Sequence, residues 1–352
     1  MPGIIEGKND DTKMSDVISS DRIEEWRTLI GEVMLDLLQK ETDPDFYDAV
    51  KYQVQTGGKR LRPLLTLTFC DAVGGTPDST IYAAAGIELI HTHSLIIDDI
   101  IDRSILRRNQ PTCWVKFGMP IAVLIAMKYR EALVLAAEKT AYPTKLQRVF
   151  SRAMQRMLIG ERLDILLEQT GRSNEYLVKN RLQDATIDDY FTLCKNKTGA
   201  LVSAACEAGV VCVNGNNEYV TAAKQFGMNA GIALQISDDY LDIFGNSQQF
   251  GKEHRKDIIE HKLGNFVILY ALSQLTAPNK HRLLEILQTD EINENEITEA
   301  GHIIKMTDAP KIAKEKVNEF VNLAKDCLKI FPDSNAKKTL FDLVGTLIDR
   351  TH

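Results

Sequence analysis

The sequence predicts an all-α protein with a single domain, on three observations. From Asp21 onward, apolar residues recur at intervals of three and four, which is the spacing of one helix face. Ala, Leu, Ile, Glu and Lys are abundant, and no strand-like alternation of apolar and polar residues persists. The breaks are short and contain Gly, Pro or Asn, and they fall at residues 74–77, 142–143, 213–216, 277–279 and 331–333. These features predict ten or more helices with short connections.

The domain organisation follows from the same pattern. Residues 1–20 are polar and aperiodic, so we expect a disordered leader there. Residues 21–352 contain neither a repeat of solenoid length nor a linker rich in Pro, Ser or Gly, and they are expected to form one domain.

Composition excludes several classes of protein. The chain has 352 residues and a net charge of −7, which disfavours a general binder of nucleic acid or anionic membranes. The six cysteines form no CxxC pair, and no apolar run reaches the roughly 18 residues of a membrane span. The start carries no signal peptide pattern. A cytoplasmic protein is therefore expected, with no integral membrane segment.

Two acidic pentads of the form DDxxD are the first functional signal. They contain the residues Asp98, Asp99, Asp102, Asp238, Asp239 and Asp242. On a helix, the first and fifth residues of a pentad lie about 40° apart around the axis and about 6 Å apart along it, so they share a face. Both pentads are surrounded by apolar sequence, unlike a solvated charged face. Carboxylates crowded in this way indicate Mg²⁺, which completes its coordination with water and phosphate oxygens.

Basic residues gather around the pentads, as a diphosphate ligand would require. They are Lys59, Arg60, Arg62, Arg107, Arg108, Lys195, Lys197, Lys252, Lys256 and Lys262. Arginine binds phosphate through a rigid fork and lysine through a movable charge. His91 lies seven residues before Asp98 and returns to nearly the same helix face. Together these residues predict a phosphate-binding cage, although each alone is more often a surface charge.

Four sequence blocks in this order carry a resemblance to a known family: GGKRLRP, IHTHSLIIDDIIDRSILRR, NKTGAL and ALQISDDYLDIFG. From about Tyr52 to about Leu272 the chain resembles the trans-isoprenyl diphosphate synthases, or polyprenyl synthetases. The resemblance implies antiparallel helices around a deep central cavity, normally in a homodimer. It also implies a reaction in which an allylic diphosphate ionises and the carbocation alkylates isopentenyl diphosphate, with three Mg²⁺ held by the two pentads.

The resemblance also implies roles for individual residues. The residues that match contacts to the allylic diphosphate are Arg107, Lys197 and Lys252. The residues that match the isopentenyl diphosphate site are Lys59, Arg62, His91 and Arg108. The matches beside the reacting carbons are Thr198 and Gln235, which with Lys197 are the expected catalytic residues, and Lys262 matches a basic residue that closes over the site.

The chain also departs from the family pattern. Glu161 stands where Gln is usual, whereas Asp164 is retained. Whether Lys252 or Lys256 reaches the diphosphate is left open.

The resemblance further implies that residues just before the first pentad line the cavity where the growing chain lies, so His93 and Ser94 bear on product length. Ser94 lies one turn before Asp98 and is small, so it would let a growing chain pass. His93 is bulky where long-chain members often carry Ala, and this favours an intermediate product, geranylgeranyl diphosphate. Farnesyl and longer products stay open, because His93 can equally pack against a neighbouring helix or a dimer interface.

The motifs disfavour three alternatives to an active synthase. A terpene cyclase normally has an Asn, Ser or Thr, and Glu triad in place of the second pentad, so the second DDxxD disfavours it. A non-catalytic regulatory subunit tends to lose pentad aspartates or basic residues, and this chain keeps both. A structural all-α protein with solvated acidic faces does not explain the ordered set of motifs.

Overall fold

The structure is a computed structural model that describes residues 20–245 and 255–349. The expected leader lies outside the described residues apart from Ser20, where the first helix begins. The first elements are α2 (Ser20–Gln39), α3 (Pro44–Val50), α4 (Tyr52–Gln55), α5 (Leu61–Ala72), the 3-10 turn η1 (Pro77–Ser79) and α6 (Ile81–Ile101).

The middle of the chain begins with a short hairpin and ends in a buried helix. Its elements are β1 (Leu106–Arg107), β2 (Gln110–Pro111), α7 (Cys113–Phe117), α8 (Met119–Glu138), α9 (Pro143–Leu166), α10 (Glu175–Asn180), α11 (Ile187–Cys194), the π-helical turn η2 (Lys195–Gly199) and α12 (Ala200–Cys212). The last elements are α13 (Asn217–Phe244), α15 (Lys256–Ile259), α16 (Phe266–Gln274), α17 (Ala277–Gln288), α18 (Glu294–Lys305), α19 (Ala309–Cys327), the 3-10 turn η3 (Leu328–Ile330) and α20 (Asn335–Asp349).

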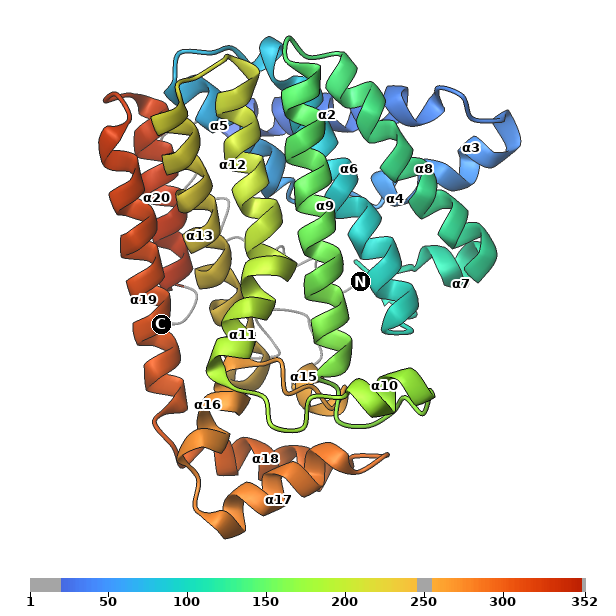
Figure 1. Ribbon diagram of the computed structural model, residues 1–352. Coiled ribbons are helices and arrows are strands. Elements are labelled where there is room, and N and C mark those ends of the chain that lie inside the picture. Colours follow the sequence, from blue (N-terminus) through green and yellow to red (C-terminus); the bar gives the residue numbers. More distant parts are fainter. Residues whose placement is uncertain (1–19, 246–254, 350–352) are drawn as a thin grey trace, which may run out of the picture.

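The core is built around α12, and the predicted all-α class is confirmed. Every residue of α12 is buried, because its sequence ALVSAACEAGVVC is almost entirely apolar or small, and its one charged residue, Glu207, pairs with Arg152 of α9. It packs against α5, α6, α9 and α13, and α13 packs in turn against α19 (Figure 1). Both pentads lie at the same ends of their helices, the first on α6 and the second on α13. The hydrophobic core is continuous from α2 to α20, as expected of a single domain.

The predicted breaks mostly coincide with helix boundaries. Pro143 and Pro278 lie in the first turns of α9 and α17, where a missing backbone N–H costs no hydrogen bond. The sequence indicated no strand, but two two-residue strands form an antiparallel hairpin directly after α6. Arg108 and Asn109 make its turn with φ of 53° and 59°, the left-handed conformation that tight hairpins require.

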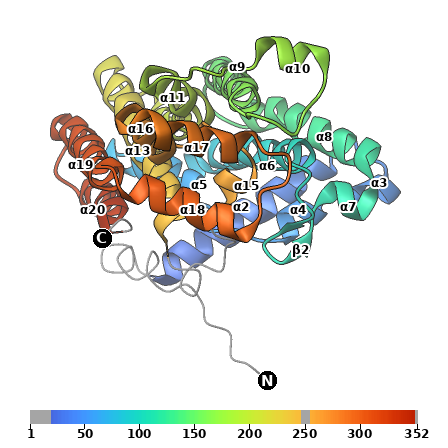
Figure 2. The same ribbon diagram turned by 90° about the horizontal axis from the view of Figure 1, so that it is seen from below.

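One end of the bundle is covered by α16, α17 and α18, which cross it below α13 and α9 (Figures 1 and 2). The short helix α15 lies between this layer and the ends of α6 and α13 that carry the pentads. Within the described residues, no helix combines the length and apolar character needed to cross a bilayer. All six cysteines, which the structure describes, are unpaired.

Candidate active site

The first pentad occupies the end of α6, and its three aspartates have different surroundings. Asp98 and Asp102 are half-buried, whereas Asp99 is 1% exposed. The guanidinium of Arg107 returns from the hairpin and donates from Nε to both oxygens of Asp99, at 2.9 and 3.0 Å. The second position of a pentad lies about 100° around the helix from the first, so it faces a different neighbour. The carboxylate of Asp99 is thus held by another side chain of the protein, that of Arg107.

The second pentad on α13 repeats this arrangement. Asp239 is buried, and its two carboxylate oxygens accept hydrogen bonds from Gln235 Nε2 and from the Phe266 amide, both at 2.9 Å. Asp238 and Asp242 are half-buried. In each pentad the middle carboxylate is therefore held by protein donors, and the outer two are more open to solvent.

A chain of hydrogen bonds joins the second pentad to η2. The Thr198 hydroxyl donates to Gln235 Oε1 at 2.6 Å, and Gln235 in turn donates to Asp239. The π-helical turn η2 brings Thr198 and Lys197 toward α13 and α9, and such turns frequently occur at functional sites. The structure thereby brings together Thr198, Gln235 and Lys197, the three expected catalytic residues, at one end of the bundle.

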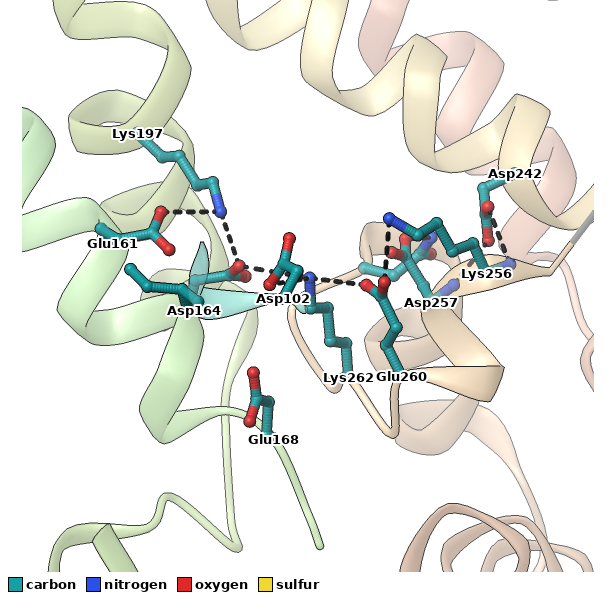
Figure 3. Close-up of polar contacts among 12 residues, drawn as sticks. Asp102, Glu161, Asp164, Glu168, Lys197, Asp242, Lys256, Asp257, Glu260 and Lys262 are labelled. Atoms are coloured by element: carbon teal, nitrogen blue, oxygen red, sulfur yellow. Dashed lines mark hydrogen bonds and ion pairs between the residues drawn. The ribbon is translucent and has the colours of Figure 1, made fainter. Parts of the chain in front are cut away.

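Lys197 lies between two acidic residues of α9. Its Nζ is 2.6 Å from Asp164 Oδ2 and 3.0 Å from Glu161 Oε2 (Figure 3). Gly160 makes this approach possible, because a Cβ there would lie 2.4 Å from the Lys197 amide nitrogen. Burial alone would lower the pKa of Lys197, but Asp164 and Glu161 outweigh it and raise that pKa. Lys197 is therefore a permanent cation beside the first pentad.

Lys262 connects the first pentad to α15. Its Nζ lies 2.8 Å from Glu260 Oε2, 3.6 Å from Asp164 Oδ2 and 3.7 Å from Asp102 Oδ1 (Figure 3). Burial opposes ionisation of Asp164, but Lys197 and Lys262 outweigh this effect and lower its pKa to about 2. Asp164 is consequently an anion shared by two lysines.

Asp242 contacts the start of α15. Its carboxylate accepts the amides of Lys256 and Asp257 at 3.0 and 3.1 Å. Lys256 Nζ pairs with Glu260 Oε1 at 2.9 Å, so Glu260 bridges the Lys256 and Lys262 side chains. Lys252 lies outside the described residues, and of the two lysines considered for the diphosphate only Lys256 is described.

A separate basic group lies where α5 meets α6. Arg62 Nη1 is 3.3 Å from His91 Nε2. Burial and the nearby charges of Arg62, Arg108 and Arg107 lower the pKa of His91 well below its usual range, so its ring is neutral. Lys59 is exposed and lies two residues before α5 begins at Leu61. Of the four residues expected at one site, Arg62, His91 and Arg108 thus lie in one basic region, with the Arg108 guanidinium against Gly58. Lys59 is the next residue after Gly58 in the chain.

Comparison with known proteins agrees with these observations. The polyprenyl synthetase family model matches residues 43–304. A short chain isoprenyl diphosphate synthase of Methanothermobacter thermautotrophicus is 30% identical over 94% of this chain and 98% of its own. A geranylgeranyl diphosphate synthase of Saccharolobus solfataricus is 32% identical over 84% of this chain and 87% of its own. The crystal structure of a geranylgeranyl pyrophosphate synthetase from Pyrococcus horikoshii has a TM-score of 0.83 and 31% identity, covering 94% of this chain and 97% of that one.

The chain belongs to the polyprenyl synthetase family. The enzyme class expected from the motifs, a trans-isoprenyl diphosphate synthase, is confirmed.

The carboxylates of the synthase suit a magnesium ion in their chemistry. Burial and Glu161 raise the pKa of Asp98 to about 7, and burial and Asp257 raise that of Asp242 to about 7. Without a nearby cation the ionised form of each carboxyl is therefore disfavoured, and a bound cation would favour it. Within the described residues, no three His, Cys, Asp or Glu side chains converge closely enough to hold a metal alone. Mg²⁺ in proteins is usually held by one or two carboxylates together with water and substrate phosphates.

Some site residues of the synthase were missed from the sequence. Asp257 and Glu260 contact the predicted residues directly, and the available signal was the charged run KDIIEHK, which ends at Lys262. Arg60 was noted only as one charge of its motif, yet it forms a buried ion pair with Glu88 at 2.7 Å. No local pattern links Arg60 to a carboxylate 28 positions away.

The two residues considered for product length face different ways. His93 Nδ1 lies 2.7 Å from the Ala126 carbonyl of α8, so it donates a hydrogen bond there. This agrees with the alternative in which His93 packs against a neighbouring helix. The Ser94 hydroxyl donates to the His91 carbonyl of its own helix at 2.9 Å. The side chain is small and is held against its own helix, so it adds little bulk at this position.

Proposed function

We propose that the synthase condenses isopentenyl diphosphate with an allylic diphosphate and releases geranylgeranyl diphosphate. The observation that carries this proposal is the bridge between the pentads: Lys262 lies within ion-pair distance of Asp102, and the start of α15 holds Asp242. Between the pentads, Lys197, Lys256 and Lys262 provide positive charge where a diphosphate would lie.

We propose that the outer aspartates of the pentads hold magnesium, three ions in all. These residues are Asp98, Asp102, Asp238 and Asp242. Asp99 and Asp239, also expected from the sequence to be ligands, are assigned to orienting the site, because they are buried and their oxygens accept hydrogen bonds from Arg107, Gln235 and the Phe266 amide. Asp242 also accepts two backbone amides, but it is only half-buried. Magnesium, when bound, supplies positive charge that stabilises the departing diphosphate.

The basic residues divide between two diphosphates in this proposal. Lys197, Lys262 and either Lys252 or Lys256 bind the allylic diphosphate. Arg107 also borders that site, where its Nη2 is 2.8 Å from Asp99. The isopentenyl diphosphate is bound by Lys59, Arg62, His91 and Arg108.

Two neutral side chains act at the reacting carbons. The Thr198 hydroxyl and the Gln235 amide are ordered by their mutual hydrogen bond and by Asp239. Ordered neutral dipoles stabilise developing positive charge without reorganising during the reaction. The surrounding apolar core excludes water that would capture the allylic cation.

A geranylgeranyl product is supported by the small Ser94 and by the names of the Saccharolobus and Pyrococcus relatives. A farnesyl or longer product is the alternative, because His93 hydrogen bonds to α8 and sets no evident stop.

We also propose that the synthase is a cytoplasmic homodimer. Exposed apolar side chains gather on α7, α8 and α9, namely Val115, Met119, Ile121, Val123, Leu124, Met127, Val134, Leu158 and Ile159. Helices α7 and α9 both pack against α8, and many exposed apolar side chains on neighbouring helices are typical of a protein interface. A second copy covering it predicts a molecular mass by light scattering near twice the 39.5 kDa of one chain. The unpaired cysteines support a reducing compartment.

The decisive experiment is incubation with isopentenyl diphosphate, Mg²⁺ and dimethylallyl, geranyl or farnesyl diphosphate, with products measured by mass spectrometry. We expect a geranylgeranyl product that is absent with Asp98→Ala. A longer or farnesyl product would contradict only the proposed chain length. No elongation from any primer would favour the regulatory subunit, and a hydrocarbon formed from one prenyl diphosphate alone would indicate a cyclase.

A further inference from the structure

Arg255 has an unusual backbone conformation just before α15. Its φ is 59°, in the left-handed region that side-chain-bearing residues seldom adopt. Such a conformation persists only where the surroundings hold it. Here the guanidinium is held by α18, because Nη1 donates to the Ile297 carbonyl at 3.1 Å.

Gly301 of α18 makes room for this guanidinium. A Cβ added at Gly301 would lie 2.9 Å from Arg255 Cζ and 3.0 Å from Nη2, closer than ordinary contacts. Gly301 lies inside α18, where glycine is a poor helix former. Glycine at this position therefore provides space for the arginine side chain, although it does not favour the helix.

The backbone of the same residue is attached to the second pentad. The Arg255 amide donates to the Asp242 carbonyl at 2.9 Å. The next two amides, of Lys256 and Asp257, donate to the Asp242 carboxylate. Figure 3 shows Asp242 lying against this turn, with the Lys256 side chain directed toward Glu260. The turn made by Arg255 thus orients Asp242 and begins the segment that leads to Lys262.

We propose that Arg255 is a positioning residue that couples α18 to the second pentad. Its side chain docks on Ile297 and Gly301, and its turn fixes the orientation of the Asp242 carboxylate. Helix α18 carries none of the predicted site residues, so Arg255 gives it an influence on the reaction. The inference rests on the proposed function, in which Asp242 binds magnesium for the allylic diphosphate.

Two substitutions test the coupling from opposite sides. Arg255→Gly keeps the left-handed turn, which glycine adopts freely, but removes the guanidinium. Gly301→Ala favours the helix and displaces the guanidinium, which is the flexible end of its side chain. Arg282→Ala is the matched control, because it breaks an ion pair between α17 and α18, Arg282 to Glu299 at 2.8 Å, without touching Arg255.

The first measurement needs no metal or substrate. We expect hydrogen exchange at the amides of Lys256 and Asp257 to be about tenfold faster in Arg255→Gly and Gly301→Ala than in the wild type. Arg282→Ala should exchange at these amides as the wild type does. In Arg255→Gly/Gly301→Ala, the alanine should add nothing, because no guanidinium is left to displace. Wild-type exchange at both amides in Gly301→Ala would overturn the inference.

The second measurement follows the reaction. In both single variants we expect the half-saturating Mg²⁺ concentration and the KM of the allylic diphosphate to rise about tenfold, with the KM of isopentenyl diphosphate unchanged. A lower melting temperature with all these constants unchanged would mean a purely structural role and would overturn the inference. A wild type that elongates no primer would overturn the proposed function and this inference together. An active wild type with unaffected variants would overturn the inference alone.

Discussion

Asp164 Oδ2 accepts a hydrogen bond from the Lys197 ammonium at 2.6 Å, and this contact joins η2 to α9 at the centre of the site. The same oxygen lies 3.6 Å from the ammonium of Lys262, which follows α15. One carboxylate therefore holds two lysines that arrive from segments 65 positions apart in the sequence. We therefore expect its removal to affect stability and catalysis together.

We expect Asp164→Asn to lower the free energy of unfolding at pH 7 by about 3 kcal/mol, because two largely buried lysines lose their shared counter-charge. Urea unfolding checks this value. Glu319→Gln is the control, since it removes an exposed ion pair with Lys316 and should cost less than about 0.5 kcal/mol. An equal cost in both variants would contradict a central role for Asp164.

The contribution of Asp164 should depend on pH in a defined way. Its pKa of about 2 in the folded protein lies below the usual 3.8, so ionised Asp164 stabilises the fold above the unfolded pKa. This stability is lost as the pH falls toward 2, about half of it by pH 3. The difference in unfolding free energy between wild type and Asp164→Asn should therefore shrink between pH 5 and pH 3. A difference that grows on acidification would contradict the assigned pKa.

The two positions within a pentad should differ in their effect on activity. Asp98→Asn removes a proposed magnesium ligand, so we expect kcat to fall at least about 100-fold and the Mg²⁺ requirement to rise. Asp99→Asn leaves the ligands in place and loosens Arg107, so we expect a loss within about tenfold. Steady-state kinetics at several Mg²⁺ concentrations separate the two. Equal losses of activity in the two variants would indicate that Asp99 is also a magnesium ligand.

Much of the fold and of the site follows from patterns of residues close together in the sequence, and it could be predicted from them. The three- and four-residue spacing indicated the helices, and the apolar text around both pentads indicated that they lie inside the protein. Helix geometry places Asp98 and Asp99 on different faces, so a difference between their surroundings was predictable, but the partner of Asp99 was not. That Arg107 returns to cover Asp99 depends on a hairpin turn, which spacing on a helix does not describe.

The unpredicted parts of the site are contacts between distant segments. Arg60 and Glu88 form a buried pair only because α5 packs on α6. Arg255 contacts Ile297 of α18, 42 positions later in the sequence. Its left-handed conformation could not be predicted either, because the position carries an arginine and not the glycine that usually marks such a turn. Such pairings follow from packing, and single-residue patterns do not contain them.

Glu161→Gln tests the unusual acid beside Lys197. Lys197 must share its charge with the Glu161 carboxylate at 3.0 Å, and a neutral amide would leave more of that charge for a diphosphate. We expect the KM of the allylic diphosphate to fall about two- to fivefold, the effect of one partly exposed ion pair. The melting temperature should hardly change, because Asp164 still binds Lys197. A raised KM would mean that Glu161 helps to bind the substrate.

The last prediction separates the two residues considered for product length. His93→Ala removes the hydrogen bond to the Ala126 carbonyl, so it should lower the unfolding free energy by about 1 kcal/mol and leave product length unchanged. Ser94→Phe places an aromatic ring one turn before Asp98, where the growing chain is proposed to pass, so the product should become shorter. Mass spectrometry of the products made from farnesyl and geranyl diphosphate measures both effects. A longer product from His93→Ala would show that the ring limits the chain despite its contact with α8, and an unchanged product from Ser94→Phe would place the chain along another face of α6.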